Sequence, residues 1–140
     1  KTEMRLVCYP KAFTAESYAI PQGTRMIGVR AFYGYGSLKE IHIPDSVVTI
    51  GNEAFIYCAY LTDLSIPESV TSIGKGAFDY CFDLTSLVIP GSVTAMGENH
   101  FTRCPETLTV TVDRDSCAHL HCRENGIRYT FPDANSWLFE

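Results

Sequence analysis

The segment IPESVTSIGKGAFDYCFDLTSLV, residues 66–88, decides the fold, because it recurs along the chain at a fixed interval of 23 residues. Its Ile-Pro pair appears at Ile20-Pro21, Ile43-Pro44, Ile66-Pro67 and Ile89-Pro90. Glycine and phenylalanine return in the same register, at Gly28, Gly51, Gly74, Gly97, Phe32, Phe55, Phe78 and Phe101. A fixed period of roughly 20–50 residues indicates a solenoid, in which each coil buries its apolar side against the next coil.

Each repeat contains the pattern of one short strand. Leu64 and Ile66 alternate with Asp63 and Ser65, which is the period-2 pattern of a half-buried strand, and Pro67 ends it because proline cannot donate a ladder hydrogen bond. We expect these strands to stack in parallel at about 4.8 Å per coil. The apolar columns should be almost fully buried at Ile43, Phe55, Leu64, Ile66, Phe78, Leu87 and Ile89.

The return segment of each repeat predicts a turn. The recurring glycine, Gly74 in this copy, is expected at positive φ. Ala77-Phe78 predicts a single helical turn that drops the ring into the coil, and Cys81 three residues later faces the same way. In the first copy Tyr35 occupies the cysteine position.

Bulk properties exclude several functional classes. The 140 residues are 46% hydrophobic with a net charge of −5, and no basic run indicates nucleic-acid or anionic-membrane binding. No apolar stretch reaches the roughly 20 residues that span a bilayer. The chain opens Lys1-Thr2-Glu3 without an initiator Met or a signal-peptide pattern, so we expect a piece of a longer protein.

The consensus Ile-Pro-x-Ser-Val-x-x-Ile-Gly-x-x-Ala-Phe-x-x-Cys-x-x-Leu resembles the BspA-like leucine-rich repeat family. The resemblance implies an α/β fold, a right-handed leucine-rich-repeat solenoid of parallel short strands and helical turns with a C-terminal capping helix. It divides one domain into an N-terminal strand and cap (residues 1–19), four repeats (20–112) and a C-terminal cap helix and tail (113–140). It also implies a cell-surface or secreted protein.

The segment from Ser116 to Tyr129 is similar to the family's terminal helix, which predicts a helix near 116–125 with Ser116 as N-cap and Asn125-Gly126 as C-cap. His121 occupies its usual aromatic position. Cys117, His119, His121 and Cys122 are good zinc ligands, but His119 lies about 160° from His121 on a helix, which favours a cap without metal. We expect the tail, residues 130–140, to pack back through Trp137, Leu138 and Phe139.

Chemistry beyond binding has little support in the sequence. Cys58, Cys81 and Cys104 share one column, where side chains point in parallel, so we expect buried reduced thiols rather than disulfides. No Gly-x-Ser-x-Gly elbow, Walker loop or dinucleotide fingerprint occurs. We expect no catalytic residue, cofactor or metal ion.

Two surfaces are candidates for recognition. Period-2 alternation predicts an outward, ligand-facing sheet surface made of Glu40, His42, Asp63, Ser65, Ser86, Val88, Thr109 and Thr111. On the turn side Tyr57, Tyr60, Tyr80 and Phe82 are either packing between coils or an exposed aromatic patch.

The resulting hypothesis is a monomeric, non-catalytic module that binds a protein or a host matrix component, as an adhesin does. It has no role for nucleic acid or membrane insertion. The alternative is a passive spacer that presents another domain of a longer surface protein. The mixed composition of the outward columns favours binding, because a spacer would show a monotonous polar face.

Overall fold

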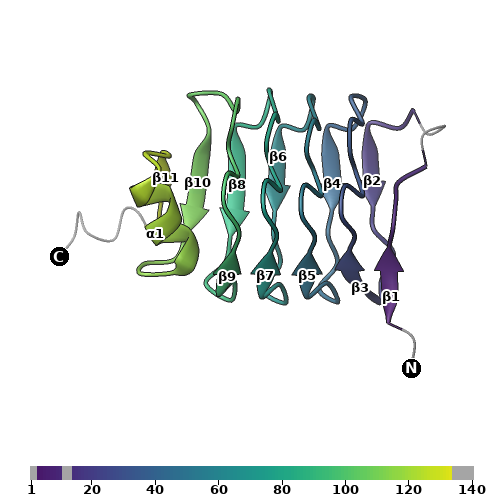
Figure 1. Ribbon diagram of the computed structural model, residues 1–140, viewed down its shortest axis with the longest axis horizontal. Helices are drawn as coiled ribbons and strands as arrows, with labels where there is room; N and C mark the ends of the chain where they lie inside the picture. Colours follow the sequence, from purple (N-terminus) through teal and green to yellow (C-terminus); the bar gives the residue numbers. More distant parts are fainter. Residues whose placement is uncertain (1–2, 11–13, 134–140) are drawn as a thin grey trace.

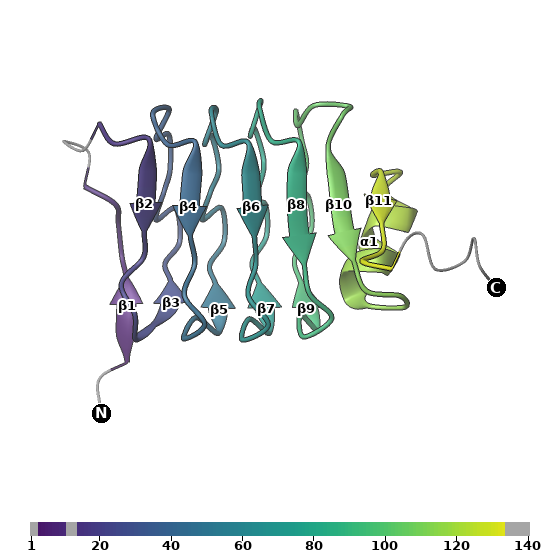
Figure 2. The ribbon, with the colours of Figure 1, turned by 180° about the vertical axis from the view of Figure 1, so that it is seen from behind.

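The computed structural model describes residues 3–10 and 14–133, which form a solenoid of parallel strands with a single helix at its C-terminal end (Figure 1). Each coil contributes one strand to each of two sheets, and every pair of neighbouring strands is parallel. Figure 2 shows the same stack from behind, with the two sheets as separate walls joined by loops at both edges. The solenoid predicted from the 23-residue period is confirmed, and the protein is mostly sheet.

The larger wall is a six-stranded sheet in the order β11-β10-β8-β6-β4-β2. Its strands follow the predicted alternation: in the second coil Ile41 is buried while Glu40 and His42 on either side of it are exposed. The strands are β2 (Ser17–Ala19), β4 (Glu40–His42), β6 (Asp63–Ser65), β8 (Ser86–Ile89), β10 (Thr109–Val112) and β11 (Tyr129–Thr130).

The smaller wall is a five-stranded sheet that closes each coil after its proline turn, in the order β1-β3-β5-β7-β9. Residues 4–19 supply a strand to each wall and place Tyr9 below the phenylalanines, so they form a further coil. The strands are β1 (Met4–Leu6), β3 (Thr24–Ile27), β5 (Thr49–Ile50), β7 (Ser72–Ile73) and β9 (Ala95–Met96).

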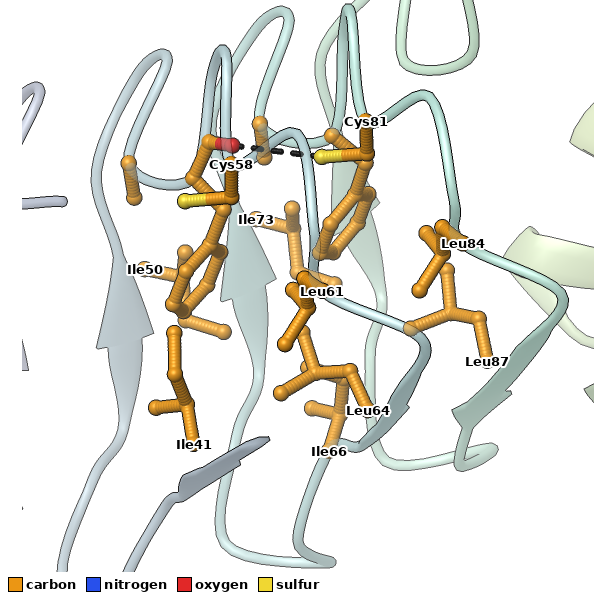
Figure 3. Close-up of a cluster of buried hydrophobic side chains, with 14 of the residues drawn as sticks. Ile41, Ile50, Cys58, Leu61, Leu64, Ile66, Ile73, Cys81, Leu84 and Leu87 are labelled. Carbon is orange, nitrogen blue, oxygen red and sulfur yellow. Dashed lines mark hydrogen bonds between the residues drawn. The ribbon is translucent and has the colours of Figure 1, made fainter. Parts of the chain in front are cut away.

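A column of stacked rings runs through the core between the walls. Phe32, Phe55 and Phe78 are fully buried, and successive ring centroids lie 5.3 and 5.9 Å apart. Aliphatic side chains from both walls surround the column (Figure 3). Burying each of these large side chains contributes about 1.5–3 kcal/mol, so the column is a major source of stability.

The predicted burial is confirmed for Phe55, Leu64, Ile66, Phe78, Leu87 and Ile89. It is wrong for Ile43, which is only half-buried. The ladder explains the exception, because β4 and β6 share a single registered pair, Glu40 with Asp63, while β6 and β8 share three. The six-stranded sheet is therefore loosened beside Ile43.

The single helical turn predicted around each phenylalanine is wrong. In the third coil the amides of Ile56 and Cys58 bond within the coil to residues three earlier, whereas those of Phe55 and Tyr57 bond to carbonyls of the next coil. This alternation leaves no continuous helical ladder. It also places Tyr57 at a φ of 60°, in the left-handed region.

The predicted positive φ of the recurring glycine is also wrong. None of Gly28, Gly51, Gly74 and Gly97 has a φ in the left-handed region. Glycine is required there because the coils touch: a Cβ on Gly74 would lie 2.4 Å from the amide nitrogen of Asn52 and 2.7 Å from the carbonyl carbon of Gly51. Glycine recurs at this position because the backbones of neighbouring coils approach closely, and not because the turn needs a positive φ.

The predicted C-terminal helix is present as α1 (Cys117–Glu124). The Ser116 side chain accepts a hydrogen bond from the amide of His119, and Asn125 closes the other end, as expected from the sequence. The packing predicted for Trp137, Leu138 and Phe139 falls outside the described residues. Within the described ranges no helix is long and apolar enough to cross a membrane.

Candidate functional site on the six-stranded sheet

The outward face of the six-stranded sheet carries all eight residues that the alternation predicted to face outward. They form two columns, because each strand presents one residue from either side of its buried central position. The side chains on β4 and β6 are exposed, and those on β8 and β10 are half-buried. The columns are Glu40, Asp63, Ser86 and Thr109, and His42, Ser65, Val88 and Thr111.

A depression of about 500 Å³ lies on this face, over strands β4 and β6, which share a single registered pair. β4 and β6, which are neighbours in Figure 2, share one registered pair, whereas β6 and β8 share three. Residues of the predicted face that line this depression are Glu40, His42, Asp63, Ser65, Ser86 and Val88.

A second depression of about 310 Å³ adjoins the first and shares Asp45, Ser65, Pro67 and Val88 with it. Thr111 lines the second depression, whereas Thr109 lines neither. The two together make one groove, hereafter the sheet groove, that crosses strands β4 to β10.

Several residues of the sheet groove are not among those that the alternation predicts to face outward. Ile43 belongs to a column predicted to be buried, but it lines the groove because it is half-buried beside the loosened ladder. Asp45 and Glu68 follow the strand-ending prolines in successive coils, and both line the groove. The recurrence of an acidic residue after Ile-Pro was the signal that could have identified them.

Carboxylates dominate the charge of the sheet groove. Among the described residues, neither depression has a lysine or arginine in its lining. Asp113 accepts a hydrogen bond from the amide of Gly91 at 2.6 Å, whereas the side chains of Asp63 and Glu68 make no ion pair or hydrogen bond with described residues. The acidic lining is Glu40, Asp45, Asp63, Glu68 and Asp113.

His42 lies beside an acidic side chain on this face. Its Nε2 lies 3.2 Å from a carboxylate oxygen of Glu40 on the same strand, and both side chains are largely exposed. Ser65 occupies the neighbouring position on β6, but its hydroxyl makes no hydrogen bond to His42 or to any other described residue. The three side chains therefore do not form the linked triad that nucleophilic catalysis requires.

Both interpretations of the turn-side aromatic residues have some support. Tyr57 and Tyr80 stack between coils with centroids 4.5 Å apart, which is the predicted inter-coil packing. Tyr60 and Phe82 are about half exposed, and Tyr33, which sequence analysis left out, extends the group through a contact with Tyr57. These residues belong to the segments that join the two sheets before β4, β6 and β8, and none of them lines the sheet groove.

The thiols of the cysteine column have a structural role. Each donates to the carbonyl oxygen of the phenylalanine in the preceding coil at 3.2 Å, and Figure 3 shows this bond for Cys81. In the second coil the hydroxyl of Tyr35 makes the equivalent bond to the carbonyl of Tyr9. Burial raises the pKa of the Cys58 thiol to about 12, which keeps it protonated and poorly nucleophilic.

The capping helix separates the four residues that resembled a zinc set. His119 accepts a hydrogen bond at Nδ1 from the amide of Asp115 and packs against Tyr129, whereas His121 faces the last coil. Cys122 is buried, and burial raises its pKa to about 11. Across the described ranges no three His, Cys, Asp or Glu side chains come close enough to hold a metal ion.

Solved structures with a similar fold are bacterial leucine-rich repeat proteins. The T. pallidum leucine-rich repeat protein TpLRR shares 34% identity over 69% of this chain and 45% of its own, with a TM-score of 0.65. The pneumococcal vaccine antigen PcpA shares 19% identity over 91% of this chain and 44% of its own, with a TM-score of 0.58. This chain therefore spans less than half of either protein.

A third similar structure, a leucine-rich cell surface protein from Faecalibacterium prausnitzii, shares 29% identity over 71% of this chain and 39% of its own, with a TM-score of 0.38. No curated protein matches the chain. The BspA type leucine-rich repeat region matches residues 2–120 as six copies, which extends the repeat beyond the four copies evident from its period. With its strands, its ring column and this match, the chain belongs to the BspA-type leucine-rich repeat family.

Proposed function

We propose that this chain is a non-catalytic recognition module of a bacterial surface or secreted protein, and that it binds a protein or host matrix component through the sheet groove. The observation that carries the proposal is the groove itself, which includes the loosened β4–β6 ladder and is lined by seven of the eight residues expected to face a ligand. A solenoid suits this role, because its outward columns can vary without disturbing the core.

The chemistry of the groove favours a partner that carries lysine or arginine. Five acidic side chains line it, and the described lining residues include no lysine or arginine, while Ile43 and Val88 add apolar area between these charges. A basic segment would complement both features, and its association should weaken as salt increases.

The binding test uses an array of purified extracellular-matrix proteins and Lys/Arg-rich peptides. A Glu40→Ala, Asp63→Ala double variant should bind the hits at least about tenfold more weakly than the parent chain, since two facing carboxylates are removed. The matched control, Glu53→Ala with Glu98→Ala, changes the net charge equally but leaves the sheet groove intact. It should keep the parent affinity at equal ionic strength.

Two outcomes would overturn the proposal. Unchanged affinity in the Glu40, Asp63 variant, together with loss on Tyr57→Ala or Tyr80→Ala, would move the binding site to the turn side. Failure of the parent chain to bind any member of the array would favour the alternative function, a passive spacer. The continuous stack of coils would suffice for that role, and no surface would need to recognise a partner.

A further inference from the structure

The last coil and helix α1 meet through two histidines, and the one on the coil departs from the repeat. His100 occupies the position held by Ala31, Ala54 and Ala77 in the earlier coils. His121 lies on α1 and faces the last coil. The two imidazole rings contact each other edge to face, with centroids 5.1 Å apart.

The surroundings of His100 suit only a neutral imidazole. The side chain is 1% exposed and lies 6.0 Å, centroid to centroid, from both Phe78 and Phe101. Its Nε2 is 2.7 Å from the carbonyl oxygen of Gly97, so Nε2 carries the hydrogen and donates it. Its Nδ1 is buried with no hydrogen-bond partner among the described residues, so a proton there would have no acceptor.

We propose that the His100–His121 contact is an acid-sensitive latch, which holds α1 against the last coil while both imidazoles are neutral and releases it when they are protonated. Protonation adds an unsatisfied buried N–H at His100. A second proton on His121 places two positive charges side by side, where they repel each other. Both effects favour separation of the helix from the coil.

Glu124 is the charged group that partly offsets this repulsion, but the pKa values of both histidines remain lowered. Burial and, to a smaller extent, the neighbouring His121 together lower the pKa of His100 to about 4, against the opposing effect of its hydrogen bond to the carbonyl of Gly97. Burial also lowers the pKa of His121, opposed by the carboxylate of Glu124 on the same helix. The coil side contributes Asn99, Phe101 and Thr102, none of which titrates in this range.

The sign of the pH dependence follows from these lowered pKa values. A released histidine regains an ordinary pKa near 6.5 and takes up a proton before the docked one does. The latch therefore contributes fully above about pH 6.5, and its contribution falls as the pH drops toward 4. Release would uncover β9, the outermost strand of the five-stranded sheet, which α1 contacts.

Hydrogen exchange measured by mass spectrometry on the whole chain tests the latch. After correction for intrinsic rates, the opening equilibrium of residues 117–124 should rise about 70-fold between pH 7.5 and pH 4.5, from the His100 values alone. Peptides from β5 to β8 provide the internal reference and should change much less. Equal acid sensitivity in the helix and the reference peptides would overturn the proposal.

The matched variants are His121→Phe, which keeps a ring on the helix, and His100→Ala with His121→Phe, which removes both titrating groups. The double variant should lose the acid response to within about threefold, and a response equal to the parent's would contradict the latch. If the double variant does not dock even at pH 7.5, an NMR titration of the parent decides the question. The His100 ring protons should then report a pKa below 5, and a value between 6 and 7 would overturn the proposal.

Discussion

Phe78 lies between the rings of Phe55 and Phe101, whereas Phe101 lies between Phe78 and the imidazole of His121. The middle ring is fully buried and the last ring is only half-buried. Both occupy the same position of the repeat, so the difference comes from their neighbours. A coil with a copy of itself on each side keeps the consensus residues, while a coil that meets a helix needs other side chains, such as His100.

Thiol labelling should give the largest contrast between the middle of the stack and its ends. Cys81 is buried, and burial raises its pKa, whereas Cys8 is exposed near the N-terminal end. We expect Cys81 to react with a thiol-specific disulfide reagent at least about 10³-fold more slowly than Cys8 in the native protein, and equally fast after unfolding. Comparable labelling rates of Cys81 and Cys8 in the native protein would show that the reagent reaches the core of the middle coils.

Ring deletion should produce the next largest effect. Phe78→Ala leaves a cavity between two rings and should lower the free energy of unfolding by about 3–5 kcal/mol. Phe101→Ala, the matched substitution at the half-buried end, should cost about 1–2 kcal/mol. Urea denaturation of both variants measures the difference. Equal costs would mean that the last coil is as tightly packed as the middle.

Addition of a single methyl group should produce the smallest effect. In Gly74→Ala the new Cβ would meet backbone atoms of the preceding coil, so we expect a loss of about 1–3 kcal/mol. Gly36→Ala is the control, because its Cβ would make an ordinary 3.7 Å contact with the ring of Tyr60 and should change stability by less than about 0.5 kcal/mol. A neutral Gly74→Ala would show that the coils can move apart without cost.

The sequence predicted most of the fold because its strongest signals report burial. Alternation around Leu64 and Leu87 placed the strands, and the recurrence of Phe55 and Phe78 placed the ring column. Both signals depend only on which side chains avoid water. The capping helix was equally clear, since Ser116 supplies a local start signal.

What the sequence could not predict depends on distances between coils. The role of Gly74 is to let two backbones touch, and a period alone does not distinguish this from a turn at positive φ. Ile43 is only half-buried because the β4–β6 ladder is short, although the isoleucines at the same position of the other repeats are buried. The sequence predicted which residues face outward, but it did not predict the groove. The groove depends on the pairing between neighbouring strands, which the alternation of side chains does not report.

The alternating amides of the turn segment have a mechanical consequence. Each coil has three sides: one strand in each sheet and the turn segment between them. On the turn side, the amides of Phe55 and Tyr57 donate hydrogen bonds to the next coil, in addition to the ladders of the two sheets. A pulling force along the stack would load all three sides at once, since these bonds run from coil to coil. A coil should therefore resist until it detaches as a whole.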